Sequence, residues 1–232
     1  MLFDATGLQS FYDAPLGQAT RRLVLRRVRA AWPDLRGQRV LGYGFAVPYL
    51  RTMLGEAERV IALMPPQHGA IAWPEQPLAA LADEDALPFP DAMFDRILMV
   101  HGLESAESTR SLMRQIWRVL APGGRLIVVA PNRTSLWAQV ERSPFAHGRP
   151  YSRSQLERLM REAMFLPERW DTALYAPPLR FRRGNRGNGW ESVGRRLWPA
   201  FAGVHLVEAT KSLYALVPQG RGERARATLA KA

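Results

Sequence analysis

The spacing of apolar residues divides the chain into alternating strands and helices between residues 38 and 132. Short unbroken apolar runs, typical of strands buried on both faces, alternate with stretches whose apolar residues recur every three or four positions, as on one side of a helix. Strands are predicted at 38–44, 58–64, 77–83, 94–100 and 122–132, with helices at 47–55 and 105–120. This alternation predicts a parallel sheet whose strands are joined by right-handed crossovers. Ser105 or Ser108 can cap the second helix.

Further elements flank this core on both sides. Before it, residues 16–32 have helical spacing, and Pro33 ends that helix. After it, the pattern predicts a helix at 152–165, a strand at 166–176, a flexible loop at 177–190, a short helix from 191 and a final strand at 204–217. The expected organisation is an N-terminal helical extension (1–37), a main domain (38–217) and a loosely ordered tail (218–232).

Composition narrows the chemistry that this fold can carry. The chain has 232 residues and no cysteine, which excludes disulfides, thiolate metal sites and cysteine nucleophiles. No uninterrupted apolar run is long enough to span a membrane, and Asp4 and Asp13 in the N-terminal stretch do not suit a secretory signal. A cytoplasmic location is therefore expected. Histidine and acidic residues form no metal-ligand cluster at helical spacing.

The formal net charge of +11 comes almost wholly from arginine, because Lys211 and Lys231 are the only lysines among 32 basic residues. Such a charge suits a polyanionic partner such as nucleic acid, yet this arginine share is also what a GC-rich coding sequence produces. The arginine-rich segment 180–196 is either a lid over an acidic substrate or a surface arm. A protein partner also stays open.

Two stretches carry a resemblance to a known family. They are "ALPFPDAMFDRILMVHGLE" (86–104) and "RVLAPGGRLIVVAP" (118–131). With the glycine-containing turn at 42–44 upstream, they resemble class I S-adenosylmethionine (SAM)-dependent methyltransferases of the small-molecule type 11 group. The resemblance covers about residues 20–217. It implies a Rossmann-like α/β fold with helices on both faces of a mostly parallel seven-stranded sheet, whose last strand is antiparallel, and it implies SAM as the cofactor.

The resemblance also assigns cofactor contacts to the loops that follow the first three strands. In the first loop they are Gly42, Tyr43, Gly44 and Phe45, where Gly44 keeps a family glycine and Gly42 replaces the leading acid. The position that normally holds the ribose hydroxyls with an acid is Met64. The adenine loop comprises Asp83, Glu84, Asp85, Ala86 and Leu87.

His101, after the fourth strand, is the candidate catalytic residue. An unperturbed imidazole titrates near neutral pH and suits a general base. A structural or pocket-lining role is the alternative. His147 and Tyr151 lie where family members carry a substrate-facing loop, so they are candidate substrate contacts.

Three functions remain after rival sites are excluded. A nicotinamide site would need a glycine at Val47 and an acid at Met64, and the chain has no G-x-S-x-G elbow for a hydrolase. The first function is a SAM-dependent methyltransferase acting on a small molecule. The second is a methyltransferase-fold protein that has lost SAM binding and serves as an interaction or regulatory partner. The third, suggested by charge, is an RNA-associated methyltransferase.

Overall fold

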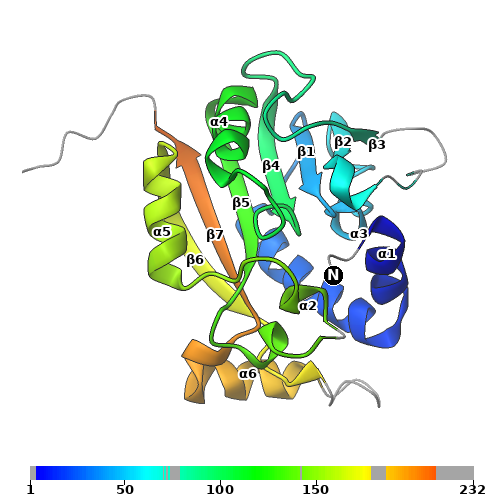
Figure 1. Ribbon diagram of the computed structural model, residues 1–232, viewed down its shortest axis with the longest axis vertical. Coiled ribbons are helices and arrows are strands. Elements are labelled where there is room, and N and C mark those ends of the chain that lie inside the picture. The colour runs from blue at the N-terminus through cyan, green and yellow to red at the C-terminus, as the bar shows by residue number, and fades with distance from the viewer. Residues whose placement is uncertain are drawn as a thin grey trace, which may run out of the picture.

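The chain folds around a seven-stranded sheet with the strand order β3-β2-β1-β4-β5-β7-β6 (Figure 1). A computed structural model describes residues 4–69, 71, 73, 79–141, 143–178 and 187–212. The strands are β1 (Arg39–Gly44), β2 (Arg59–Met64), β3 (Ala79–Leu81), β4 (Phe94–Val100), β5 (Leu120–Pro131), β6 (Phe165–Ala173) and β7 (Val204–Lys211). The helices are α1 (Ala5–Asp13), α2 (Pro15–Ala31), α3 (Val47–Leu50), α4 (Thr109–Val119), α5 (Arg153–Glu162) and α6 (Gly187–Leu197).

The sheet is parallel from β3 through β5, and β7 runs antiparallel to both of its neighbours. This confirms the expected fold class. Strand order reverses between β1 and β4, and ligands of such sheets bind beyond the carboxyl ends of the strands at that reversal. The geometry therefore directs attention to the segments that follow Gly44 and Val100.

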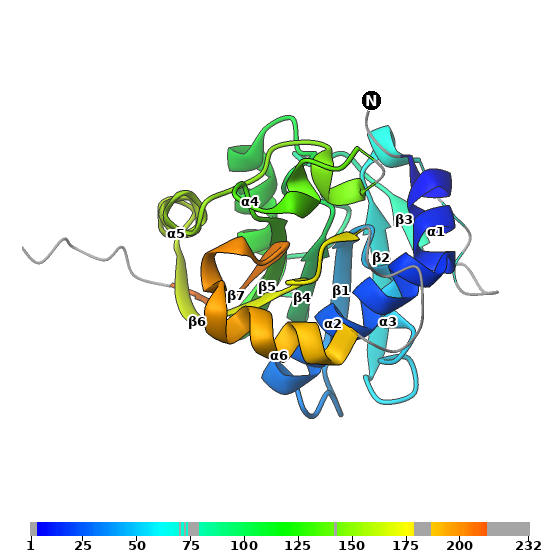
Figure 2. The same cartoon turned by 90° about the horizontal axis from the view of Figure 1, so that it is seen from below.

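Helices cover the sheet in two layers. The apolar side chains of α1, α2 and α3 form one buried cluster with the sheet, and those of α4 and α5 form another. Figure 2 shows α4 and α5 on one face and α2 and α6 on the other. Successive residues of β1 serve both layers, since Val40 belongs to the first cluster and Leu41 to the second. This is why its sequence is apolar without alternation.

Most element bounds agree with the pattern of the sequence, and a few differ. Helix α3 ends at Leu50 and not at residue 55, because the chain turns back through 51–56 to enter β2. Helix α6 begins at Gly187, inside the segment predicted as a loop. The glycine and asparagine content of that segment had led to a loop prediction that extends too far. Ser108 is the residue that caps α4. Residues 179–186 and 213–232, which include the predicted tail, lie outside the described residues.

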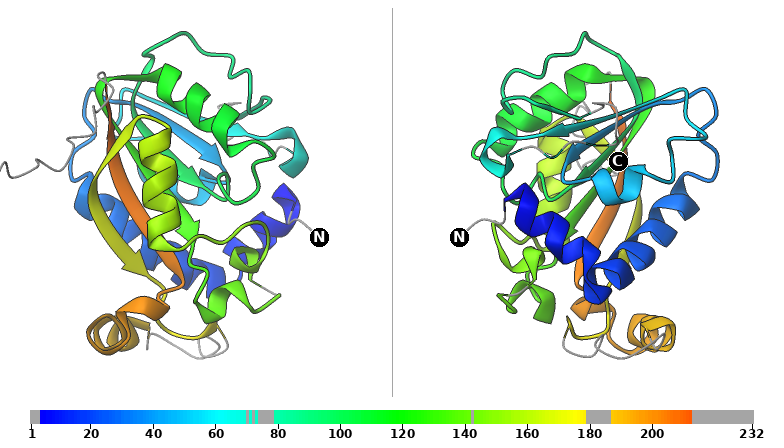
Figure 3. Two further views of the ribbon diagram at one scale, coloured as in Figure 1. Left: turned by 60° about the vertical axis from the view of Figure 1, so that its left-hand side comes forward. Right: turned by 90° about the vertical axis from the view of Figure 1, so that its right-hand side faces the viewer.

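Helices α1 and α2 are separated by a sharp corner. Pro15 opens α2, and Ala14 before it is extended, as a residue preceding proline prefers. The helices approach so closely there that a Cβ on Gly17 would overlap the backbone carbonyl of Phe11. As a result α2 lies along one face of the sheet, while α1 turns towards the ends of β1 and β4 (Figure 3).

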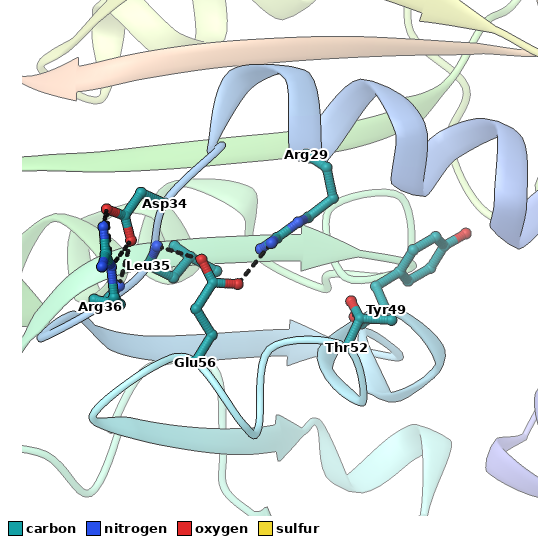
Figure 4. Close-up of polar contacts among 7 residues, drawn as sticks. All are labelled: Arg29, Asp34, Leu35, Arg36, Tyr49, Thr52 and Glu56. Atoms are coloured by element: carbon teal, nitrogen blue, oxygen red, sulfur yellow. Dashed lines mark hydrogen bonds and ion pairs between the residues drawn. The ribbon is translucent and has the colours of Figure 1, made fainter.

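One carboxylate fixes α2 to the segment that leads into β2. Glu56 accepts a hydrogen bond from Arg29 Nη2 at 2.6 Å and another from the Leu35 amide at 2.8 Å (Figure 4). Arg29 beside it holds the pKa of the Glu56 carboxyl below its ordinary value. This contact joins α2 to the segment that precedes β2.

Candidate active site at the carboxyl ends of β1 and β4

The loop after β1 turns at Gly44 and packs against the end of β4. Gly44 has φ of +79°, and a Cβ there would overlap the Val100 carbonyl oxygen and the Gly102 amide. The Phe45 amide donates to the Val100 carbonyl at 2.7 Å. A Cβ on Gly42 would likewise overlap a side chain of α3. Both glycines are therefore required by contacts within the protein itself.

Helix α1 shields this loop from solvent. The Tyr12 ring stacks on Phe45, with 6.0 Å between centroids and 18° between planes, and meets Tyr49 edge-on at 5.8 Å. Phe45 is 1% exposed and Tyr12 is 5% exposed. Phe45, predicted to contact the cofactor, is thus covered by an aromatic ring from the N-terminal extension.

A buried chain of hydrogen bonds runs from α3 to the loop after β4. The Tyr12 hydroxyl lies 2.9 Å from the Tyr49 hydroxyl and 2.9 Å from His101 Nε2. On the other side of the ring, His101 Nδ1 lies 3.1 Å from Glu104 Oε1. An ionised carboxylate can only accept, so His101 donates from Nδ1 and accepts at Nε2 from Tyr12, which in turn accepts from Tyr49. Glu104 thereby selects the tautomer whose Nε2 is a base.

The backbone at His101 is unusual and serves this contact. His101 has φ of 53°, in the left-handed region that a residue with a side chain rarely adopts. Gly102 follows it, and a Cβ at that position would overlap the Tyr43 ring. The tight turn brings the imidazole between Glu104 and Tyr12.

Several polar groups around this network are buried without a partner among the described residues. They are Glu104 Oε2, His68 Nδ1 and the Tyr43 hydroxyl. Burial lowers the pKa of His68 to about 4, with the nearby His101 acting in the same direction. Burial raises the pKa of Tyr12 and of Tyr43 above their ordinary range. Each unpaired group costs roughly 1–3 kcal/mol, so these atoms mark where a bound molecule would gain most.

The residues of the loop predicted to hold adenine have different structural roles. Glu84 accepts from the amides of Glu107 and Ser108, before α4. Asp83 is exposed after the end of β3, and Leu87 is 4% exposed behind the loop. Asp85 and Ala86 are also exposed. Asp83 therefore keeps a carboxylate available to a ligand.

The position at the end of β2 is filled by an apolar side chain. Met64 is fully buried, and its carbonyl accepts from the Ala82 amide at 3.2 Å. The structure thus places Met64 beside the segment that leads to Asp83, and the Met64 side chain carries no carboxylate for a ribose hydroxyl.

A loop between β5 and α5 closes the site on the His101 side. The ring of Phe145 lies 4.8 Å from the imidazole of His101, centroid to centroid. Next to it, a cavity of about 510 Å³ is bounded by Glu104 and His147 among other residues. His147 Nε2 pairs with the Glu141 carbonyl at 2.8 Å, and the Tyr151 hydroxyl donates to the Leu103 carbonyl at 3.4 Å. Both predicted substrate contacts therefore border the site through this loop.

Tyr12, Tyr49 and His68 were missed by reasoning from the sequence. Tyr12 is 89 residues from His101 along the chain, and nothing in the sequence around it marks it as part of a site. The spacing of His101 and Glu104 was visible, but their contact depends on the turn between them. Among the described residues, no group of histidine and acidic side chains could hold a metal ion, and no helix is long and apolar enough to cross a membrane.

Comparisons with known proteins agree with this geometry. A family model described as "Methyltransferase domain" matches residues 41–128. A demethylmenaquinone methyltransferase from Deinococcus radiodurans is 29% identical over 120 residues, which are 51% of this chain and 49% of that protein. The chain thus spans about half of this curated relative.

Solved structures share the fold at low identity. A SAM-dependent methyltransferase from Thermotoga maritima has a TM-score of 0.62 at 20% identity, covering 88% of this chain and 94% of its own. The Burkholderia thailandensis 1,6-didemethyltoxoflavin-N1-methyltransferase, solved with 1,6-didemethyltoxoflavin and S-adenosylhomocysteine, has a TM-score of 0.54 at 17% identity over 86% of this chain and 79% of its own. Residues 41–128 therefore match the methyltransferase-domain family, and the chain shares its fold with SAM-dependent methyltransferases.

Proposed function

We propose that this protein transfers the methyl group of SAM to a small-molecule acceptor, and that His101 takes the acceptor's proton. One observation carries the proposal. His101 is held on one side by Glu104, and its Nε2 faces a hydroxyl group at 2.9 Å. A buried imidazole with this orientation suits a general base, because its unprotonated nitrogen already accepts a hydrogen bond from an O–H group.

The adenine end of SAM fits the described residues. Asp83 offers an exposed carboxylate to the adenine amino group, and Leu87 gives an apolar backing. The Tyr43 hydroxyl, buried without a partner among the described residues, adds a polar group at the end of β1. We assign Asp83, Ala86 and Leu87 to the adenine.

The ribose and methionine ends fit differently from the family pattern. Met64 supplies no carboxylate, so a charge-assisted hydrogen bond worth roughly 1.5–3 kcal/mol is missing from the ribose contact. Phe45 and Tyr12 cover the first loop. We infer that α1 moves away from the loop when the cofactor binds, and that Gly42, Tyr43 and Gly44 then border its methionine end.

The Tyr12 hydroxyl indicates the chemistry of the acceptor. The Tyr12 hydroxyl donates a hydrogen bond to His101 Nε2. We infer that the hydroxyl group of the methyl-accepting substrate takes the same position once α1 has moved. When bound, SAM supplies an electrophilic methyl group on its sulfur. The acceptor would then bond to the methyl carbon as the carbon–sulfur bond breaks and S-adenosylhomocysteine leaves, while His101 takes the hydroxyl proton and Glu104 stabilises the resulting imidazolium. The relative from Deinococcus radiodurans, named for demethylmenaquinone, makes a phenol-like acceptor the first to try.

Calorimetry and a transfer assay test this function together. We expect S-adenosylhomocysteine to bind the full chain at micromolar concentration, and His101→Asn to keep that affinity while losing methyl transfer by about a hundredfold or more. The assay uses labelled SAM with reduced demethylmenaquinone. His205→Asn is the matched control, because His205 is also a buried histidine and lies outside the candidate active site. If neither SAM nor S-adenosylhomocysteine binds at millimolar concentration, the proposal is wrong.

A second function is favoured by Met64 and by the buried Phe45–Tyr12 pair. These features suit a methyltransferase-fold protein that no longer binds SAM and acts through a partner. The same calorimetry separates the two, since this candidate requires no binding of either ligand. The RNA-associated alternative depends on the arginines of 180–196, part of which lies outside the described residues, and it stays a prediction. Its test is whether polyanion affinity falls steeply with salt.

A further inference from the structure

A second cavity lies at the far side of the sheet, away from the loops after β1, β2, β3 and β4. Its volume is about 490 Å³. It is bounded by the end of β5, the start of α5, the end of β6 and the start of β7, through the residues Asn132, Thr134, Ser152, Arg153, Trp170, Asp171, Thr172, Ala200 and His205. Asn132, Thr134 and Ser152 come from the loop between β5 and α5, but none of the nine residues bounds the cavity beside Glu104 and His147.

The cavity carries a positive charge without a carboxylate partner. The Arg153 guanidinium carbon lies 4.8 Å from the centre of the Trp170 ring. No described acidic residue forms an ion pair with Arg153, whereas Asp171, which shares the cavity, lies 3.7 Å from Arg27 and accepts from the Thr172 amide. Arg27, which does not line the cavity, thus neutralises Asp171. The Arg153 guanidinium remains available to an anion.

His205 adds a buried polar group to the same wall. Its residue is 8% exposed, and Nε2 has no hydrogen-bond partner among the described residues. Burial lowers the pKa of this imidazole to about 4, and Arg153 nearby acts in the same direction, so the ring is neutral at neutral pH. The ring meets Trp170 edge-on at 6.5 Å. Burying this nitrogen without a hydrogen bond is unfavourable, so a ligand that forms a hydrogen bond with it gains binding energy.

The rest of the wall is held in place by bonds within the protein. Asn132 Nδ2 donates to the carbonyls of Ala200 and Ala202 at 2.9 and 2.8 Å. Thr134 donates to the same Ala200 carbonyl at 2.8 Å. The Thr172 and Tyr175 hydroxyls pair at 2.6 Å. The cavity is therefore pre-formed, as binding sites for small molecules usually are.

We propose that this cavity binds a small organic acid, whose carboxylate or phosphate pairs with Arg153 and whose body lies against Trp170 and His205. Arginine suits both oxyanions, because its planar guanidinium can donate two parallel hydrogen bonds. The size and the aromatic wall require an organic body and not a bare ion. The site is separate from the proposed methyl-transfer site and does not depend on it.

Titration calorimetry with benzoate, phenyl phosphate and inorganic phosphate tests the proposal on the full chain. We expect saturable binding of benzoate or phenyl phosphate, weakened about tenfold or more by Arg153→Ala. Arg158→Ala is the matched control, because Arg158 also lies on α5, is 76% exposed and pairs with Glu162. That variant should bind as the wild type does. Asp83→Asn should also leave this affinity unchanged, which separates the cavity from the proposed cofactor site.

Imidazole NMR of the unmodified protein provides a second readout if a variant fails to fold. We expect the His205 ring nitrogens to shift on saturation with the probe that binds. The proposal is overturned if no probe saturates, if inorganic phosphate binds as tightly as phenyl phosphate, if Arg158→Ala loses as much affinity as Arg153→Ala, or if the His205 signals do not move.

Discussion

Among single residues, the orientation of the His101 imidazole depends on the left-handed backbone conformation of His101 itself. The two side chains of His101 and Glu104 are three positions apart, and the left-handed φ of His101 directs the imidazole onto the carboxylate. Strained backbone of this kind concentrates at functional sites. Glu104 acts here through His101, so it is a positioning residue.

We predict that Glu104→Gln lowers kcat about tenfold to a hundredfold and leaves the KM for the acceptor nearly unchanged. The amide still reaches Nδ1 but cannot stabilise an imidazolium by charge. A shift of the kcat–pH profile should accompany the loss, which a purely structural defect would not produce. Glu107→Gln, on the same loop but exposed, serves as control. An unchanged pH profile would contradict the positioning role.

Gly44 tests the packing of the first loop. We expect Gly44→Ala to lower the free energy of unfolding by at least about 2 kcal/mol, since the new methyl group combines an unfavourable φ with an overlap on β4. Gly37→Ala is the control, because Gly37 has a similar φ of +68° with open space around it and should lose only about 1 kcal/mol. Urea unfolding measures both. Equal losses would show that backbone conformation alone matters.

At the scale of elements, the sequence pattern located the strands well because a doubly covered strand needs an unbroken apolar run. It placed helix ends less well, as α3 shows by stopping at Leu50 once the chain must return to β2. The role of α1 was out of reach. Its buried positions look like those of any helix packed on a core, and its partners Phe45 and His101 come from other elements.

The contact of α1 with the first loop predicts a coupling to the cofactor. If the covered state must open before SAM binds, the apparent affinity is reduced by the fraction of time that the loop is covered. Tyr12→Ala removes the ring on Phe45 and should tighten S-adenosylhomocysteine binding several-fold. Arg22→Ala, an exposed change on α2, should not. Weaker binding by Tyr12→Ala in calorimetry would mean that α1 forms part of the cofactor site.

At the scale of the whole molecule, burial of two histidines makes stability depend on pH. His68 and His205 each have a pKa of about 4 in the fold, lowered first by burial, against about 6.5 in an unfolded chain. Between these values the unfolded chain binds more protons than the folded one, so stability falls as pH drops from about 6.5 towards 4.

We therefore predict that the free energy of unfolding decreases as the pH is lowered from 7 to 5. The decrease should be smaller for His205→Phe than for the wild type. Urea titrations at the two pH values measure this. Comparing the differences between pH values, and not the stabilities themselves, removes the packing cost of the substitution. An equal decrease in both proteins would mean that His205 is charged in the fold.

From the sequence alone, apolar periodicity predicted the succession of strands and helices and the parallel sheet, and the motif around "RVLAPGG" indicated the resemblance to methyltransferases, because both depend on local chemistry. His101 was also a candidate at that level. The surroundings of His101 depend on tertiary contacts. Tyr12, Tyr49 and Glu104 come from separate segments and meet around His101. The corner at Pro15 and the left-handed turn at His101 accompany this arrangement, and Glu56 links α2 to the segment before β2. Contacts between distant segments leave no periodic signal in a single chain, so residues 40–50 show a turn but not the Tyr12 ring that covers it.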